Sequence, residues 1–248
     1  MNPIDGPPDA LGSCAVLEPA PPVVRRLMAA WPIGLGLETA ALAVVTTAAV
    51  KITAVHGAAD LRRLAIPALL VAGAALPTWI AGREFPPFGL DSRNLRRALR
   101  PVGCLCLCIF PLVFLGLWLL TSLHLPVPLR PVMADGQSWL AWLLYQFLYV
   151  AVAEEVFFRG YVQANIMRLL ERAPRLSSLG QQRVAILLSA ACFAVAHLVV
   201  QGQITSLLVF LPGLILAWLF AHTRSLLAPV LFHGLANAVY FALAMLLL

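Results

Sequence analysis

Two adjacent glutamates and an arginine interrupt an otherwise apolar stretch and are the first candidates for chemistry. Glu154, Glu155 and Arg159 occur in AVAEEVFFRGY. An ionised side chain at the centre of a membrane helix costs roughly 2.5–3.5 kcal/mol, so it needs a partner or a function. Glu155 and Arg159 are four residues apart and share a helix face, whereas Glu154 points about 100° away. We predict that Glu155 pairs with Arg159 and that Glu154 is the freer carboxylate. The alternative is a helix that ends near the glutamates and leaves both at the membrane interface.

Two further apolar stretches contain isolated polar residues. His197 lies in CFAVAHLVV, and His233 and Asn237 lie in LFHGLANAVY, where a spacing of four places them on one helix face. A lone histidine on an apolar helix is more often a packed, hydrogen-bonded residue than a catalyst. Gly234 and its small neighbours would let another helix or a substrate approach closely. The sequence therefore allows the glutamates and both histidines to form one cluster.

The elements that must position these residues are membrane helices. Hydrophobic residues make up 61% of the 248 residues and charged residues 11%, and the mean hydropathy is +0.90, which lies outside the range of soluble domains. We predict an all-α fold, a polytopic transmembrane helix bundle of about seven spans. The apolar segments are 31–52, 64–81, 102–123, 138–160, 184–200, 204–222 and 226–248.

The positive charge indicates how the chain is oriented. The net charge of +6 comes from sixteen arginines and Lys51 against eleven acidic residues, and basic residues collect in cytoplasmic loops of membrane proteins. Arginines are concentrated in the stretches 83–100 and 168–183. We therefore expect both loops and the N-terminus to be cytoplasmic, in a multi-pass protein of a bacterial cell membrane. Nucleic acid is not expected as a partner.

Three regions follow from this pattern. Residues 1–24 contain Pro3, Pro7, Pro8, Pro19, Pro21 and Pro22. They are predicted to form a disordered tail. Residues 25–137 are expected to hold the N-terminal transmembrane helices, and residues 138–248 the catalytic transmembrane core.

Three motifs resemble those of a known protease family. EEVFFR at 154–159, FAVAH at 193–197 and HGLAN at 233–237 are similar to the EExxxR, FxxxH and HxxxN motifs of the CAAX protease and bacteriocin-processing family. Its members are glutamic-type intramembrane endopeptidases, the Ras-converting prenyl-protein protease among them. The resemblance covers about residues 138–242, and the first three spans match only in being apolar.

The resemblance implies an activity and a set of roles. It implies hydrolysis of a peptide bond in a membrane-associated or hydrophobic protein or peptide, within the lipid bilayer and without a cofactor or metal. The implied roles are Glu154 as the base that activates water, His197 beside it, Glu155 and Arg159 in support, His233 and Asn237 as oxyanion donors, and Phe193 as a substrate contact.

Other functions stay open at this point. Glu154, His197 and His233 are a carboxylate and two imidazoles, a common ligand set for a divalent metal, so a metal-dependent membrane protease is one alternative. A catalytically idle scaffold or immunity protein of the same family is another. HExxH and GxSxG motifs do not occur in the sequence, so neither the usual zinc protease nor a serine-elbow hydrolase is expected.

Overall fold

The computed structural model describes residues 22–90, 92–125, 127, 138–172 and 176–247, without the side chains of residues 22–32, 59, 60 and 92. Throughout these ranges the secondary structure is helical, with no strand. Residues 1–21, most of the predicted tail, lie outside the described residues; α1 begins at Pro22. The elements are α1 (Pro22–His56), α2 (Ala59–Ile80), α3 (Ser92–Ser122), α4 (Trp139–Tyr145), η1 (Gln146–Ala151), α5 (Val152–Glu155), η2 (Val156–Gln163), α6 (Ala164–Leu170), α7 (Ser178–Gln201), η3 (Ile204–Val209), α8 (Phe210–Thr223) and α9 (Leu227–Leu247).

Seven helical stretches of the described chain are long and apolar enough to cross a membrane. They are Ile33–His56, Leu61–Ile80, Arg93–Ser122, Trp139–Leu170, Ser178–Gln201, Ile204–Thr223 and Leu227–Leu247. The predicted all-α bundle of about seven spans is therefore confirmed, and the chain is a multi-pass membrane protein.

Several helices are longer than the segments predicted from the sequence, and the third and fourth spans are the most informative. The third helix begins at Ser92 and not near 102, and the fourth continues to Leu170 and not to 160. The arginines of 93–100 thus lie on the first turns of α3 and not in a loop. An apolar window detects only the part of a helix that lipid covers, whereas arginine is a good helix former and extends the helix beyond it.

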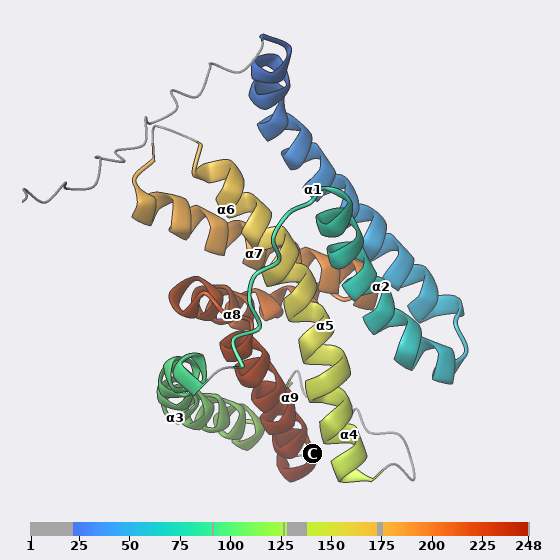
Figure 1. Cartoon of the computed structure of the whole chain (residues 1–248). Helices are drawn as coiled ribbons and strands as arrows, with labels where there is room; N and C mark the ends of the chain where they lie inside the picture. The colour runs from blue at the N-terminus through green and yellow to red at the C-terminus, as the bar shows by residue number, and fades with distance from the viewer. Residues whose placement is uncertain (1–21, 91, 126, 128–137, 173–175, 248) are drawn as a thin grey trace, which may run out of the picture.

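The fourth span forms one continuous helical rod from Trp139 to Leu170 through the middle of the bundle (Figure 1). It alternates between α-helical and π-helical turns: η1 and η2 are π-helical, and α5 lies between them with Glu154 and Glu155. A π turn shifts the direction of the side chains that follow it and frequently occurs at functional sites. All eight residues of η2 are buried, so this part of the rod is the centre of the bundle.

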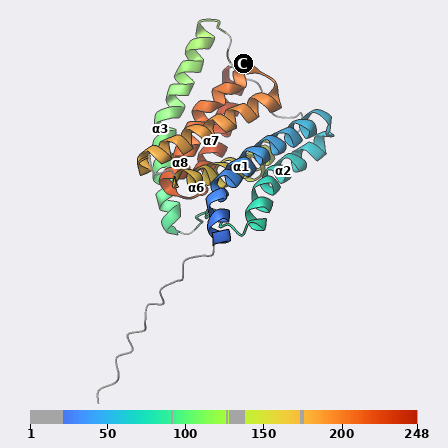
Figure 2. The ribbon, with the colours of Figure 1, turned by 90° about the horizontal axis from the view of Figure 1, so that it is seen from above.

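The other helices surround this rod. α1 and α2 pack together, and α2 and α7 contact η2. α9 contacts η1 and α8, and α3 packs on α9 and α8 at an edge of the bundle (Figure 2). The rod therefore holds its polar residues against α7, α8 and α9.

Contacts at one end of the bundle bring together segments predicted to lie on the same side of the membrane. Arg168 of α6 donates to the carbonyl of Glu84, in the connection after α2. Ser225, in the turn between α8 and α9, donates to the carbonyl of Phe88 at 2.8 Å. The two arginine-rich stretches thus share one end, as the alternation of seven spans requires.

The opposite end is joined by two other contacts. Lys51 Nζ of α1 donates to the carbonyl of Val200 at 2.9 Å, in the last turn of α7. Tyr145 OH of α4 donates to the carbonyl of Arg63 at 3.1 Å. Because α2 and α7 each run from one set of contacts to the other, Lys51 and Arg63 lie at the opposite end from the arginine-rich stretches.

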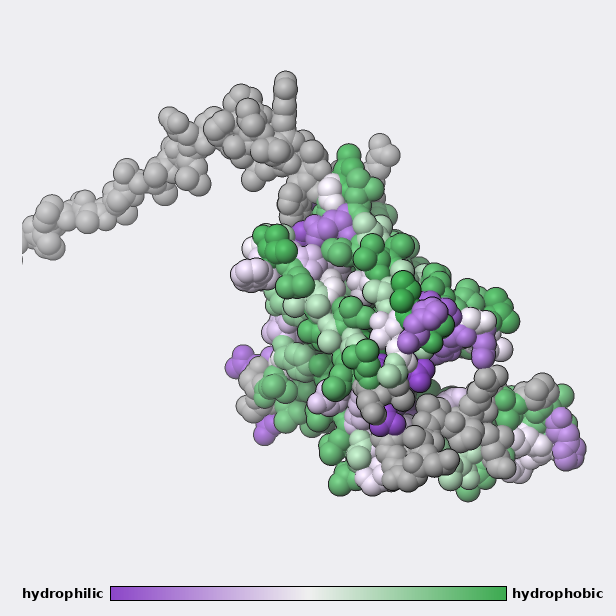
Figure 3. Space-filling model, turned by 90° about the vertical axis from the view of Figure 1, so that its right-hand side faces the viewer, coloured by the Kyte–Doolittle hydropathy of each residue, from purple (hydrophilic) through white to green (hydrophobic). Residues whose placement is uncertain are grey.

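The surface is dominated by apolar side chains. Figure 3 shows hydrophobic residues over most of one side, with hydrophilic residues in separate patches. Trp79 and Leu107 are each 79% exposed. Exposed apolar area of this extent suits contact with lipid chains and not with water.

Candidate active site

Glu155 is fully buried and engaged on both of its oxygens. Its Oε1 accepts a hydrogen bond from His233 Nδ1 at 2.8 Å, and its Oε2 lies 3.1 Å from Arg159 Nε. The side chains of Glu155 and Arg159 are both 0% exposed. The predicted pairing of Glu155 with Arg159 is therefore confirmed. The rod continues well beyond the glutamates, so the alternative of an interfacial helix end is wrong.

Arg159 links this pair to α7 and α8. Its Nη2 donates to the carbonyl of Gly213 at 3.1 Å, and its Cζ lies 4.6 Å from the centre of the Phe193 ring. The packing between α7 and α8 is close here, because a Cβ atom on Gly213 would lie 3.2 Å from Phe193 Cδ1. A carboxylate, a carbonyl and an aromatic face thus compensate the buried guanidinium.

Glu154 faces the two histidines with a single oxygen. Its Oε2 lies 3.9 Å from His197 Nε2 and 3.8 Å from His233 Nε2. These separations exceed a direct hydrogen bond, and a polar contact of that length is one that a single water can bridge. The Glu154 side chain is 19% exposed. Glu154 is thus the more accessible of the two carboxylates.

His197 is held by the backbone of its own helix. Its Nδ1 donates to the carbonyl of Phe193 at 2.9 Å, because a carbonyl oxygen can only accept. In the neutral ring this bond leaves Nε2, the atom facing Glu154, as an acceptor. The Phe193 ring packs against His197 with 4.4 Å between ring centres and lies 6.1 Å from the ring of His233.

The Phe193 ring therefore packs against three residues of the cluster, Arg159, His197 and His233. It is 3% exposed. The substrate contact expected for Phe193 stays a prediction.

Asn237 lies one turn beyond His233 on α9 and contacts a residue that the sequence did not single out. Its Nδ2 donates to Gln146 Oε1 at 3.0 Å, at the start of η1. α9 approaches η1 closely at Gly234, where an added Cβ would lie 2.4 Å from the Phe147 ring. The close approach expected from the small residues beside His233 is thus present, and it comes from another helix.

Other buried polar residues extend the cluster and were missed. Gln163, four residues after Arg159, donates to the carbonyl of Ala217 at 2.9 Å, and Ser189 donates to the carbonyl of Phe158 at 3.2 Å. The spacing of Gln163 from Arg159 was a signal, since residues four apart share a helix face. Together with Arg159 to Gly213, these bonds fix η2 between α7 and α8.

A second polar cluster connects α1 to the rod. Glu38 of α1 pairs with Arg83, which follows α2, and accepts a hydrogen bond from Tyr161 OH of η2 at 3.0 Å. This contact could not be predicted from the sequence, since the three residues are far apart along the chain. It joins the first two helices to the part of the rod that follows Arg159.

The structure thus brings Glu154, Glu155, Arg159, His197 and His233 together and places Asn237 on the same helix as His233. Among the described residues, no group of three or more histidine, cysteine, aspartate or glutamate side chains has an arrangement suited to hold a metal ion.

A comparison with protein families finds a match that contains all three motifs of this cluster. Residues 136–239 match the family described as Rce1-like, type II CAAX prenyl endopeptidase. This match supports a CAAX protease family assignment for this part of the chain. The match confirms the family expected from the motifs, and its range is close to the predicted 138–242. The Rce1-like segment comprises the rod, α7, η3, α8 and most of α9, all the helices that carry the cluster. The match supports the general activity of a CAAX-type membrane endopeptidase. No curated protein and no solved structure matches the chain.

Proposed function

We propose that the chain is a glutamic-type intramembrane endopeptidase in which Glu154 activates a water that hydrolyses a peptide bond. The observation that supports this most directly is the division of work between the two glutamates. Both oxygens of Glu155 lie against Arg159 and His233, whereas Oε2 of the partly exposed Glu154 faces two imidazole nitrogens at 3.8–3.9 Å.

A water beside Glu154 would meet two acceptors. Glu154 Oε2 accepts one of its hydrogens, and Nε2 of His197 accepts the other because the Phe193 carbonyl holds the ring proton on Nδ1. Both hydrogens then point away from the bond to be cleaved, and a lone pair of the oxygen points toward it. The two acceptors orient the nucleophile before it reacts.

The reaction needs a proton acceptor and a proton donor. Glu154 takes a proton as the water oxygen bonds to the carbonyl carbon, and the carbonyl π electrons move to its oxygen. When that oxyanion re-forms the C=O bond, the C–N bond breaks and the proton held by Glu154 passes to the leaving amine. The products are a carboxylic acid and an amine, and the carboxylate of Glu154 is regenerated.

Asn237 and His233 are the proposed oxyanion donors. An amide nitrogen carries two N–H donors, and the bond from Asn237 to Gln146 uses one of them. His233 already uses Nδ1 for Glu155, so it donates from Nε2 only when both ring nitrogens carry a proton. Asn237 therefore acts in either protonation state of His233.

The proposed substrate is a membrane-associated or hydrophobic peptide or protein. Residues 136–239 match a family of type II CAAX prenyl endopeptidases, and the cluster lies within helices that suit a bilayer. A farnesylated peptide ending in a Cys-aliphatic-aliphatic-X tail is therefore the first probe, and the same peptide without the lipid is the second.

Metal dependence separates this mechanism from its nearest alternative. The full-length protein, purified and placed in liposomes, is assayed with the farnesylated peptide before and after treatment with a strong chelator. Bound metal is measured on the same sample. We expect turnover to be unchanged by the chelator and to be independent of metal content.

Activity that disappears with the chelator and returns with one equivalent of a divalent ion would show that Glu154, His197 and His233 are ligands. The glutamic mechanism would then be wrong. The lipid-free peptide tests a different point, since equal turnover of both peptides would show that the lipid is not recognised.

We further propose that the chain lies in the cell membrane with the end that holds Arg168, Glu84 and Ser225 in the cytoplasm. This assignment follows from the concentration of arginine in the two stretches that meet there. Single cysteines at positions 84 and 168, in a variant without the native cysteines, are treated in intact cells with an impermeant thiol reagent. We expect no labelling, while a cysteine at position 57, in the connection between α1 and α2, is labelled; the reverse pattern contradicts the orientation.

A further inference from the structure

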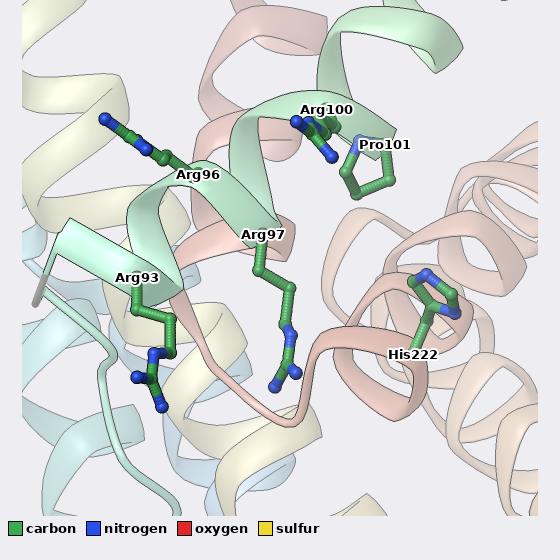
Figure 4. Close-up of a pocket in the computed structure, with 6 residues that line it drawn as sticks. All are labelled: Arg93, Arg96, Arg97, Arg100, Pro101 and His222. Carbon is green, nitrogen blue, oxygen red and sulfur yellow. The ribbon is translucent and has the colours of Figure 1, made fainter.

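A basic pocket lies between the start of α3 and the end of α8, away from the candidate active site. Its volume is about 660 Å³. It is lined by Arg93, Arg96, Arg97, Arg100, Pro101 and His222, and we refer to it as the arginine pocket. In Figure 4, Arg93 and Arg97 extend in the same direction from α3, and His222 is on the neighbouring helix. None of these lining residues is acidic.

The four arginines share one face of the helix. They occupy positions i, i+3, i+4 and i+7, which lie on one side of an α-helix. Residues on the other side, Ala98 at 0% exposure and Val102 at 3%, pack in a core with Leu227 and Phe232 of α9. The packing of α3 therefore keeps the four arginines off the side that contacts α9, with Arg93 and Arg97 extending together and Arg96 extending in another direction (Figure 4).

Four arginines on one helix face form a strongly basic surface. Like charges three and four residues apart repel each other on a helix. Cations are also disfavoured near a helix N-terminus, where the backbone dipole is positive. An orientation signal requires arginines on this side of the membrane, but it does not require them to line a pocket with His222 of a different helix. An anionic ligand would account both for the four arginines on one helix face and for their position beside His222.

His222 lines the pocket from α8. It lies in the last turn of α8 and stacks on Trp218, with 4.9 Å between the ring centres and 11° between the ring planes. Trp218 is 40% exposed, and tryptophan is enriched where a membrane helix meets the headgroup layer. The pocket thus lies at the level where lipid headgroups are found.

An apolar surface extends from the pocket along α3. Leu107 is 79% exposed and Leu112 is 67% exposed. A ligand with a phosphate and acyl chains would meet arginine at one end and apolar side chains at the other. A soluble anion would use only the first part of this surface.

We propose that the arginine pocket binds the headgroup of an anionic phospholipid. The planar guanidinium of arginine forms paired hydrogen bonds to phosphate oxygens, and basic pockets between membrane helices on the cytoplasmic side suit acidic headgroups. The site is independent of peptide hydrolysis and stands whether or not the proposed function is correct.

Lipid retention by the full-length protein tests the proposal. The protein in detergent micelles receives equal amounts of phosphatidylglycerol and phosphatidylcholine, and native mass spectrometry measures the bound fraction of each. We expect phosphatidylglycerol to bind at least about 10-fold more tightly. The double variant Arg93→Gln/Arg97→Gln should bind it roughly 30-fold more weakly with phosphatidylcholine unchanged, and Arg96→Gln/Arg100→Gln should act in the same direction.

A matched control removes the same charge elsewhere. Arg172→Gln/Arg183→Gln changes two arginines of the other arginine-rich stretch that are exposed, as those of the pocket are, but do not line the pocket, and we expect less than about a 2-fold effect because isolated surface charges act weakly. An equal loss in this control would show general charge attraction and overturn the proposal. Equal binding of the two lipids would overturn it as well. Displacement of phosphatidylglycerol by the same concentration of inorganic phosphate would assign the pocket to a soluble anion.

Discussion

The two sides of the Glu154–Glu155 pair differ in burial, in partners and in the work that they can do. On the Glu155 side, a fully buried carboxylate lies against Arg159 and His233 at 3.1 and 2.8 Å. On the Glu154 side, a carboxylate with 19% exposure faces His197 and His233 at 3.8–3.9 Å. Adjacent residues on a helix point about 100° apart, so two consecutive side chains can lie in two different environments.

His233 belongs to both sides. Its Nδ1 contacts Glu155 and its Nε2 faces Glu154, so the structural pair orients a ring that takes part in the proposed chemistry. A metal-free hydrolase needs a carboxylate that can exchange a proton, and a membrane bundle needs its other charges compensated. The pair meets both needs, and substitutions on each side should therefore have different consequences.

The largest expected effect on turnover is on the Glu154 side. Glu154→Gln keeps the shape of the side chain but removes the proton acceptor, so we expect at least about a 1000-fold loss of turnover. The fold should be retained, because the Glu154 side chain is 19% exposed and lies 3.8–3.9 Å from the two histidines, beyond a direct hydrogen bond. Turnover of the farnesylated peptide and the thermal unfolding midpoint are measured on the same preparation.

Glu154→Gln also tests whether Glu154 and Glu155 have different roles. A variant that unfolds or fails to insert would show that Glu154, like Glu155, is structural. A folded variant with nearly normal turnover would remove Glu154 from the mechanism.

Substitutions on the Glu155 side should lower the stability of the protein as well as its turnover. Arg159→Ala leaves Glu155 buried without its cation, and breaking a buried pair costs about 3–5 kcal/mol. We expect a lower unfolding midpoint in detergent together with lost turnover. Arg159→Ala/Glu155→Gln removes both charges and should recover part of the stability but not the turnover. If Arg159→Ala alone were as stable as the parent protein, the proposed difference between the Glu154 and Glu155 sides would be wrong.

The sequence predicted which charged residues and histidines come together in this cluster better than it predicted the residues around them. Glu155 and Arg159 could be paired from their spacing alone, because helix geometry fixes which residues share a face. Ionisable residues in apolar segments were recognisable because burial of charge is costly. Both arguments are local and need no knowledge of the tertiary structure.

The parts that could not be predicted depend on contacts between distant segments. Gln146 and Ser189 are common polar residues, and nothing in their own segments shows that one meets Asn237 and the other the Phe158 carbonyl. The π-helical turns have no sequence signature of comparable strength. The arginines of 93–100 were assigned to a loop because a hydropathy window cannot distinguish a charged helix from a charged connection.

A smaller effect is expected where an oxyanion donor is removed. Asn237→Ala deletes one of the two proposed donors and should lower kcat by about 100-fold to 1000-fold with little change in KM, as is typical of a lost oxyanion contact. Asn237 is half-buried, so the unfolding midpoint should move little. A variant with a higher KM and an unchanged kcat would indicate that Asn237 binds substrate and does not stabilise the transition state.

Gln146 gives the smallest effect and the sharpest test of how Asn237 acts. Its Oε1 accepts from Asn237 Nδ2 at 3.0 Å, which fixes the direction of the amide. Gln146→Ala should lower kcat by roughly 10-fold, because a displacement of about 1 Å in a catalytic group costs up to about 100-fold. Gln146→Glu preserves the acceptor and should retain more turnover than Gln146→Ala.

The double variant separates positioning from general damage. If Gln146 acts only through Asn237, Gln146→Ala/Asn237→Ala should be no slower than Asn237→Ala alone, since the partner that Gln146 orients is already absent. Losses that multiply would show that Gln146 affects turnover by another route. The residue would then belong with the packing of η1 against α9, where Gly234 and Phe147 already bring the two helices together.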